Sequence, residues 1–342
     1  QHREMLTPSL ALLLLLSRAW AFTHATARST TARRASPQED SNLASEVVVM
    51  VNGLPGSMGV AVAEACARRG MEVAGVALSS KASSGKTTTV AEKVVEFAGP
   101  DDADAAARSL RDACAARGKV LVAVDYTVPD ACTGNAELYA RHDIPFVMGT
   151  TGGDVERMEA AVSARPKLLA LVAPNMAKQI VAVQAAIANA ARDFPGAFAG
   201  YDLSVVESHQ ATKKDTSGTA KAVVASLVDL IDADYDTDAA IQAIERVRDE
   251  PTQLSGAGDR LQRVPTSALA GHAYHTYALQ SPAGDVRFEL RHNVNGRSVY
   301  AEGTADAVLF LARRLLLDDD DTADRKKRIF NMIDVLQSGE LY

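Results

Sequence analysis

One short stretch of the sequence, residues 207–219, concentrates side chains that could do chemistry. His209 can give or take a proton near neutral pH, and Lys213 adds a fixed positive charge on what we expect to be the same loop. Ser217 is placed to cap a helix that begins at about Thr219, where backbone N–H groups and hydroxyls can receive a carboxylate. Together these residues predict a pocket for a small anionic substrate that has to be protonated.

A glycine-rich turn earlier in the chain is a second candidate site. A β-branched run typical of a strand, residues 46–51, leads into this turn, and a helical stretch follows from Val60 to Arg69. Strand, glycine-rich turn and helix in this order indicate a dinucleotide-binding site, because glycines let the backbone approach a pyrophosphate at the helix N-terminus. The residues expected to contact the cofactor here are Gly53, Leu54, Pro55, Gly56, Ser57, Met58 and Gly59.

The choice between the two nicotinamide dinucleotides should depend on the end of the next strand, which we expect over Met71–Leu78. An acidic residue at that end would bind the ribose 2′-hydroxyl of NAD. Here the chain continues Ser79-Ser80-Lys81, two hydroxyls and a cation, which suit a 2′-phosphate. We therefore expect NADPH to be preferred over NADH, with Ser79 and Lys81 in the binding site.

Three further apolar runs extend the expected sheet. They cover residues 120–125, before a helix from Pro129, residues 145–148 and residues 168–172. Apolar runs that alternate with helix-length segments predict a parallel sheet covered on both faces, with ligands at the carboxyl ends of the strands. The cofactor contacts expected after the second and third runs are Gly149, Thr150, Thr151, Ala173, Pro174, Asn175 and Met176.

Length and composition limit the class of protein. The chain has 342 residues, which suggests two domains, and 47% of them are hydrophobic and 23% charged, as in ordinary globular proteins. A formal net charge of −7 and only 5% aromatic residues argue against a nucleic-acid or anionic-membrane binder. The scattered Cys66, Cys114 and Cys132 are expected to be buried thiols in a reducing compartment.

The first 45 residues have the composition of a targeting leader. The apolar run at residues 10–16 is too short to span a bilayer, and the small-residue pattern Ala19-x-Ala21 follows it, as in a signal peptide. The stretch from Phe22 to Gln38 contains arginines, serines and threonines but no acidic residue, which is typical of a transit peptide. This order resembles the bipartite plastid leader of algae with secondary plastids and implies the plastid stroma. Simple secretion is the alternative.

Four motifs occur in an order that matches a known family. They are Glu207-Ser-His209-x-x-x-Lys213-x-Asp-x-Ser217-Gly-Thr219, Gly53-x-x-Gly56-x-Met-Gly59, Gly149-Thr-Thr151 and Ala173-Pro-Asn175. From about Val47 to the C-terminus the chain resembles dihydrodipicolinate reductase, and three later segments resemble its plant-type branch: residues 271–275, 291–297 and 300–304. The bacterial pattern has a second histidine where this chain has Gln210, and its loop before Ser217 is longer.

The resemblance implies a reaction, a fold and a set of roles. The reaction is NAD(P)H-dependent reduction of 4-hydroxy-tetrahydrodipicolinate to tetrahydrodipicolinate in the diaminopimelate route of lysine biosynthesis. The implied α/β fold has a Rossmann domain over residues 46–174 and 305–342, and an α+β domain with an open mixed sheet over residues 175–304. The second domain binds the substrate and contacts other subunits, so a homo-oligomer, dimer or tetramer, is expected. The implied catalytic residues are His209 and Lys213, and the implied substrate-binding residues are Gln210, Ser217, Gly218 and Thr219.

Other functions predict different features. Another two-domain NAD(P) oxidoreductase of amino-acid metabolism, such as a homoserine or aspartate dehydrogenase, does not share the loop at residues 209–219, and a non-catalytic nucleotide sensor needs no proton donor there. We expect no metal. His272 and His275 are three positions apart on an expected strand and should point to opposite faces. The run Asp318–Asp321 lacks the glycine-containing spacing of a calcium loop.

Overall fold

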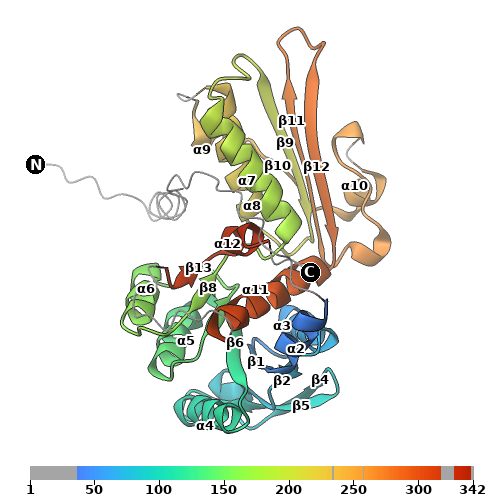
Figure 1. The fold of residues 1–342 in the computed structure, drawn as a ribbon. Coiled ribbons are helices and arrows are strands. Elements are labelled where there is room, and N and C mark those ends of the chain that lie inside the picture. The colour runs from blue at the N-terminus through green and yellow to red at the C-terminus, as the bar shows by residue number, and fades with distance from the viewer. Residues whose placement is uncertain (1–36, 233–234, 257, 317–326, 340–342) are drawn as a thin grey trace, which may run out of the picture. The chain divides into compact units, whose positions relative to one another are not determined.

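The computed structural model describes residues 37–232, 235–256, 258–316 and 327–339, drawn as coloured ribbon in Figure 1. Residues 1–36 of the expected leader and the run Asp318–Asp321 lie outside the described residues. The described chain has the predicted α/β fold, with a parallel sheet and a second, mixed sheet.

The parallel sheet has six strands in the order β13-β8-β7-β6-β1-β2. In that order they are Ile329–Phe330, Ala170–Val172, Phe146–Met148, Val120–Asp125, Val47–Asn52 and Glu72–Val73. The helices on it are α3 (Ser57–Arg68), α4 (Ala103–Ala116), α5 (Pro129–Arg141), α6 (Val155–Ser163) and α11 (Ser298–Leu316). Val47, Val49 and Val51 of β1 enter the core under α3 and α11, whereas Val48 and Met50 enter the core under α4, α5 and α6. Burial on both faces explains why the strands are continuous apolar runs.

The segment expected as one strand over Met71–Leu78 is instead two short strands in different sheets. β2 pairs with β1, whereas β3 (Val76–Leu78) pairs with β5 (Lys93–Ala98) in a three-stranded sheet completed by β4 (Thr87–Val90). The partner changes at Gly75, whose carbonyl accepts a hydrogen bond of 2.9 Å from the N–H of Glu96. Apolar residues occur on both sides of this change, so the hydrophobic pattern alone could not reveal it.

The mixed sheet has four strands in the order β10-β9-β11-β12. In that order they are Glu245–Val247, Asp202–His209, His272–Gln280 and Arg287–Asn295; β9 and β10 are parallel and the other pairs antiparallel. Two helices, α7 (Lys178–Asp193) and α8 (Gly218–Ile231), cover one face (Figure 1), where Val223 and Leu227 pack with Tyr277. On the other face, Val206 and Tyr274 pack with residues that follow α10 (Glu250–Ser255). The short α9 (Thr237–Gln242) lies between α8 and β10 in the sequence.

The last described elements return to the parallel sheet. β13 extends this sheet beside β8, and α12 (Met332–Gln337) follows it. In α11, the buried Asp306 carboxylate pairs with Arg69 (2.5 Å) and with Lys178 (2.5 Å) at the start of α7. Gly303 of α11 lies so close to Met176 that a Cβ there would be 1.7 Å from the Met176 carbonyl oxygen. This contact fixes α11 against the segment that connects the two sheets.

Residues next to the expected leader boundary belong to the folded body. The helix α2 (Pro37–Ser45) precedes β1, and its Leu43 and Ala44 are buried in the same core as α3 and α11. A mature chain that began at residue 46 would lose these contacts. The site of leader removal stays a prediction.

The cysteines are buried, as predicted. Cys66, Cys114 and Cys132 are free thiols inside the fold, and burial raises the pKa of Cys66 to about 12. A thiol with so high a pKa is a poor nucleophile at neutral pH. Among the described helices, none combines the length and the hydropathy that a bilayer span requires.

Candidate active site

The turn between β1 and α3 has the backbone geometry of a dinucleotide cradle. Gly53 has a φ of 113°, and a Cβ on it would lie 2.4 Å from the carbonyl oxygen of Tyr126. The N–H of Gly56 donates to the Gly53 carbonyl (2.8 Å), and a Cβ on Gly59 would lie 3.0 Å from the Gly53 backbone. No side chain caps α3, and its first turn has no acidic residue. The first N–H groups of α3 therefore stay available to a pyrophosphate.

The other predicted residues of this turn differ in exposure. Leu54 is buried and Met58 half-buried, so these two side chains pack under the turn, while Pro55 and Ser57 are exposed at its surface. Contact with the cofactor from Leu54 would therefore come from its backbone.

The segment expected to bind the 2′-phosphate follows a strand that reaches this turn. The N–H of Leu78 donates to Asn52 Oδ1 (2.6 Å), which places the end of β3 beside the end of β1. Ser79 continues from there, and its N–H donates to the Ala98 carbonyl (2.9 Å). The Lys81 ammonium is exposed and lies 3.5 Å from an Asp101 carboxylate oxygen. An exposed pair of this kind is weak, so the Lys81 side chain can exchange Asp101 for a phosphate.

A buried polar network at the ends of β1 and β6 was missed by the sequence reading. Asp125, the last residue of β6, accepts hydrogen bonds from Tyr139 (2.7 Å) and Asn135 (2.8 Å). Asn52, the last residue of β1, donates to the Tyr139 hydroxyl (2.7 Å). The signal in the sequence that could have indicated this network is the polar residue at the end of each otherwise apolar strand. The network fixes both strand ends next to the predicted cofactor site.

The end of β7 approaches the same turn. A Cβ on Gly149 would lie 2.3 Å from the ring of Tyr126, so only glycine fits this close contact. The Thr150 hydroxyl donates to backbone carbonyls, including that of Thr127 (3.3 Å), whereas Thr151 is exposed. Of the two threonines, Thr150 bonds the neighbouring backbone, and Thr151 is the one exposed to solvent.

The end of β8 meets the start of α8, which joins the two predicted sites. Asn175 Nδ2 donates to the hydroxyl of Thr219 (3.1 Å), and Asn175 Oδ1 accepts from the N–H of Ala177 (2.9 Å). Of its predicted neighbours, Ala173 and Met176 are buried and Pro174 is exposed. The structure therefore brings a predicted cofactor segment into contact with a predicted substrate residue.

His209 lies on a strand and not on a loop, which corrects the expectation from the sequence. It is the last residue of β9, pairs with Ala273 of β11, and is 7% exposed. Its Nε2 is 3.3 Å from Nε2 of His275, and the His275 Nε2 is 3.8 Å from a Glu207 carboxylate oxygen. The His292 ring stacks on His275, with 4.6 Å between ring centroids. His209 therefore begins a row of three imidazole rings that crosses β9, β11 and β12, of which His209 and His275 are buried and His292 is half-buried.

Burial and nearby cations keep these histidines neutral. Burial, followed by the charges of Arg248 and Lys213, lowers the pKa of His209 to about 3. Burial also places the pKa of His275 well below its ordinary value and lowers that of His292 to about 4. At neutral pH the hydrogen bond between His209 and His275 is therefore one between two uncharged imidazoles.

The loop after His209 carries the other predicted residues. Lys213 is half-buried, and its Nζ lies 3.2 Å from Asp215; its N–H donates to the carbonyl of the half-buried Gln210 (2.9 Å). Gly218 is the exposed first residue of α8. Lys213 and the start of α8 thus border the same short loop as His209.

Ser217 occupies the N-cap position of α8, but its side chain makes no capping hydrogen bond. The acceptor at this helix start comes from another element: the Ser217 N–H donates to a carboxylate oxygen of the fully buried Glu207 (2.9 Å). The serine hydroxyl is therefore not used by the helix.

One described group could hold a metal ion by distance alone: the ligand atoms of Glu207, His209 and His275 lie within 4.8 Å of one another. Both carboxylate oxygens of Glu207 already accept hydrogen bonds, from Arg248 and from Ser217. Lys213 and Arg248 add two positive charges beside the imidazoles. These cations oppose a metal ion, so we interpret the group as a hydrogen-bonded cluster. His272 points to the other face, as predicted, where it bonds Ser208 (2.8 Å).

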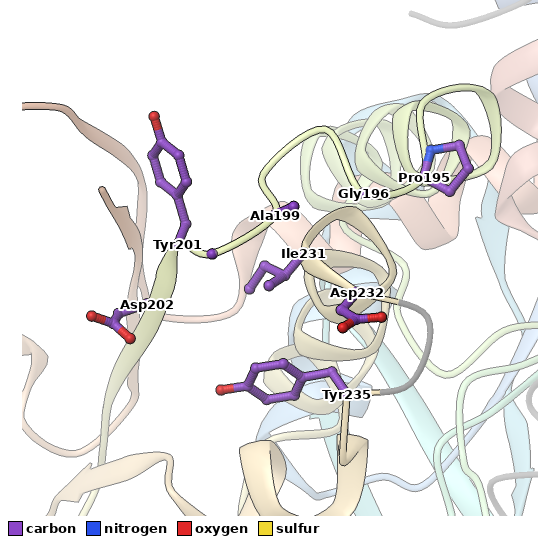
Figure 2. Close-up of a pocket in the computed structure, with 9 residues that line it drawn as sticks. Pro195, Gly196, Ala199, Tyr201, Asp202, Ile231, Asp232 and Tyr235 are labelled. Atoms are coloured by element: carbon purple, nitrogen blue, oxygen red, sulfur yellow. The ribbon is translucent and has the colours of Figure 1, made fainter. Parts of the chain in front are cut away.

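A separate cavity of about 640 Å³ lies at the far end of α8 (Figure 2). Tyr201, Asp202, Asp232 and Tyr235 line it, and the rings of Tyr201 and Tyr235 do not face each other. Because α8 has 14 residues, this cavity is about 20 Å along the helix from Gly218. Its described lining holds no cation that would receive an anionic substrate.

Known proteins resemble this chain over the residues of both sheets. The family model described as "Dihydrodipicolinate reductase, N-terminus" matches residues 47–176, and the model of the C-terminus of the same family matches residues 179–336. The chain is 43% identical over 295 residues to the chloroplastic 4-hydroxy-tetrahydrodipicolinate reductase 1 of Arabidopsis thaliana, covering 86% of this chain and 79% of that protein. It is 42% identical over 293 residues to the probable chloroplastic 4-hydroxy-tetrahydrodipicolinate reductase 2 of Oryza sativa subsp. japonica, covering 86% of this chain and 84% of that protein.

A solved structure has the same fold. The dipicolinate-bound dihydrodipicolinate reductase from Paenisporosarcina sp. TG-14 matches with a TM-score of 0.53 at 19% identity, covering 78% of this chain and 94% of that one. At this identity the match concerns the fold alone.

Proposed function

The chain belongs to the dihydrodipicolinate reductase family and is an NAD(P)H-dependent reductase of lysine biosynthesis; from this premise we propose how its residues carry out the reaction. When bound, NAD(P)H would supply a hydride to the ring of the unsaturated cyclic imine, which 4-hydroxy-tetrahydrodipicolinate forms when its hydroxyl leaves as water. The neighbouring ring carbon then has carbanion character, and His209 protonates it. The contact between Asn175 and Thr219 supports this proposal most strongly, because it joins the cofactor strand ends to the helix start beside His209.

The substrate is a small dicarboxylate, and the loop after His209 offers two places for its carboxylates. Lys213 provides a positive charge that is only half-buried, so it can leave Asp215 for a substrate carboxylate. The N-terminus of α8, with Gly218, Thr219 and the unused hydroxyl of Ser217, receives the other carboxylate. Gln210 adds a polar contact. The dipicolinate in the related bacterial reductase is a planar dicarboxylate of this kind.

The low pKa of His209 gives the substrate a second role. In the free protein His209 is neutral above about pH 4, because its pKa is about 3. A carboxylate bound to Lys213 offsets one of the charges that lower this pKa, so the pKa of His209 rises when substrate binds. The substrate itself thus helps His209 to take up the proton that it later donates.

The experiment that tests the assignment is a coupled assay with freshly made 4-hydroxy-tetrahydrodipicolinate and either dinucleotide. We expect nucleotide oxidation that depends on this substrate. Oxidation of NAD(P)H with aspartate semialdehyde in place of this substrate would contradict the assignment.

We further propose that NADPH is the preferred cofactor. Ser79 and Lys81 stand where a strict NAD site has an acidic residue. The substitution Lys81→Glu should raise KM for NADPH much more than KM for NADH, because it removes an ion pair with the 2′-phosphate and adds repulsion. Steady-state kinetics with both cofactors measure the difference. Equal increases in KM for both cofactors would show that Lys81 does not contact the 2′-phosphate. Lys86→Glu serves as the control for an added negative surface charge.

We propose that the protein works in the plastid stroma after removal of a bipartite leader. The relatives from Arabidopsis thaliana and Oryza sativa subsp. japonica are named chloroplastic, and the leader has segments in the order needed for ER entry and then plastid import. A fluorescent fusion of residues 5–45 should label the stroma of an alga with a secondary plastid. The Phe22→Ala fusion should stay outside the stroma. Secretion of the unchanged fusion into the medium would contradict the proposal.

We also propose that residues 46–174 with 305–342 and residues 175–304 act as two domains that close on a hinge. The two family models meet between residues 176 and 179, next to the proposed hinge. The open mixed sheet would then serve as the contact of a homo-oligomer, a dimer or a tetramer. The exposed residues of β12 provide such a surface.

A further inference from the structure

We propose that Arg248 is a positioning residue that holds the substrate loop, residues 210–217, in the shape required for substrate binding. This inference rests on the function proposed above. Arg248 follows β10 and lies 35 residues after Lys213 in sequence, outside the motif that contains His209 and Lys213. Its side chain is 18% exposed.

The guanidinium of Arg248 contacts the loop at two points along its length. Its Nε donates to the carbonyl of Lys213 (2.8 Å), and its Nη2 donates to the carbonyl of Asp215 (3.3 Å). One planar group therefore holds the backbone carbonyls of both Lys213 and Asp215. Since Lys213 is the proposed carboxylate ligand, this fixes where its side chain starts.

Glu207 completes the arrangement from β9. One of its oxygens pairs with Nη2 of Arg248, and the other accepts from the N–H of Ser217 at the end of the loop. Arg248 Nη1 also donates to the Glu207 carbonyl (3.4 Å). The ion pair between Arg248 and Glu207 thus connects the loop to β9. The second oxygen of Glu207 holds the start of α8, through the N–H of Ser217. Removing a carboxylate and a guanidinium from water is costly, and here the pair is compensated by hydrogen bonds to the loop, to Ser217, and to the backbone carbonyls of Glu207 and Val247.

Lysine cannot replace arginine in this role. An ammonium keeps the positive charge, but it lacks the planar fork that donates to Glu207, Lys213 and Asp215 at the same time. The variant Arg248→Lys therefore separates loop position from charge. The variant Arg248→Gln removes both, and Glu207→Gln/Arg248→Gln also removes the unpaired carboxylate that would otherwise be left buried.

The charge of Arg248 can be tested separately from its positioning role, through its effect on the pKa of His209. The charged and titratable groups that influence His209 or its partner imidazole are Glu207 on β9, Lys213 on the loop, Arg248 after β10, His275 on β11, His292 on β12 and, from the other face of β11, His272. Removing the positive charge in Arg248→Gln should move the pH profile of kcat/KM toward higher pH, because protonated His209 is then less disfavoured. Arg248→Lys should leave that profile in place.

The test is steady-state kinetics of these variants as full-length folded protein, with 4-hydroxy-tetrahydrodipicolinate and NAD(P)H each varied. We expect Arg248→Lys to lower kcat/KM for the dicarboxylate by up to about 10²-fold, mainly through KM, with KM for the nucleotide unchanged. The double variant should regain thermal stability relative to Arg248→Gln but keep the high substrate KM. Arg260→Lys, which changes an exposed arginine paired with Glu245, is the matched control and should behave like the unchanged protein.

Two results would overturn the inference. One is a substrate KM of Arg248→Lys equal to that of the unchanged protein, and the other is recovery of the normal substrate KM in the double variant. Failure of the unchanged protein to oxidise NAD(P)H with this substrate would instead contradict the proposed function. The two failures are therefore distinguishable in the same assay.

Discussion

Replacing His209 by glutamine is expected to lower kcat by about 10²–10⁴-fold while KM changes little, because general acid catalysis contributes an effect of this order. Glutamine keeps a polar group at the end of β9 and can still bond His275, but it has no proton to give to the ring carbon. The substrate carboxylates bind elsewhere, to Lys213 and the start of α8, so ground-state binding should persist. Steady-state kinetics at saturating cofactor measure both constants.

Two control variants accompany this prediction. His272→Gln makes the same change on the opposite face of β11, where the side chain bonds Ser208, and should alter kcat only slightly. Gln210→Ala should have a milder effect than His209→Gln, because it removes a polar contact without removing a proton. If His209→Gln kept a near-normal kcat while Lys213→Ala abolished activity, the proton donor would have to be reassigned to Lys213.

The substitution Lys213→Ala is expected to raise KM for the dicarboxylate about tenfold to a hundredfold, the range for a lost hydrogen bond to a charged group. A fall in kcat should accompany it, because a carboxylate that Lys213 no longer holds leaves the reacting ring carbon less well placed against His209. The two effects together distinguish this variant from His209→Gln, which should change kcat alone. The same kinetic assay, with substrate varied over a wide range, measures them.

The neighbouring Lys214 provides a matched control. It is exposed and next in sequence, so Lys214→Ala removes an equal charge from the same loop. We expect its KM to stay within about twofold of normal, because exposed charges interact weakly through water. An equal rise in KM for both lysine variants would indicate that the substrate responds to the total positive charge of the loop. That result would contradict a specific ion pair at Lys213.

The parallel sheet could be predicted from the sequence because strands that are buried on both faces are continuous apolar runs. β6, β7 and β8 lie within the expected apolar runs, and β1 extends one residue beyond its run, to Asn52. The helix α3 begins at Ser57, earlier than the expected Val60, because the glycine turn leads directly into it. The prediction of a single strand over residues 71–78 was wrong, because an apolar run carries no information about a change of partner strand. Within this run, Gly75 was the one residue that indicated where the change occurs.

The site was predictable where its residues are neighbours in sequence and not where tertiary pairing supplies them. The glycine turn, the loop after His209 and the start of α8 are local, so their motifs showed them. His275, His292 and Arg248 reach the same place through strand register and a loop contact, and no spacing in the sequence connects them with His209. The alternation of residues along β11 and β12 was the one available signal, since His275 and His292 are directly paired.

Two local expectations were wrong for a similar reason. The strand β9 continues through Ser208 and is buried on both faces from Val205 onward, so His209 is a buried strand residue with a pKa of about 3 and not a loop histidine. Ser217 has the position of a helix cap, but Glu207 from the adjacent strand supplies the acceptor. In both cases a residue from another part of the fold decided the local structure.

The central claim is that His209 gains its proton when a dicarboxylate occupies the site, and NMR titration of the histidine Cε1–H signals tests it most directly. Dipicolinate, which cannot accept the hydride in the same way as the substrate, serves as the probe together with oxidised nucleotide. The His209 signal is assigned as the one missing from His209→Gln. In the free protein this signal should stay that of a neutral imidazole down to about pH 4, because burial, Arg248 and Lys213 lower its pKa to about 3. With dipicolinate bound, the pKa should rise by about 1–3 pH units, as expected for an added negative charge nearby. An unchanged or lower pKa of His209 at saturating dipicolinate would contradict the account.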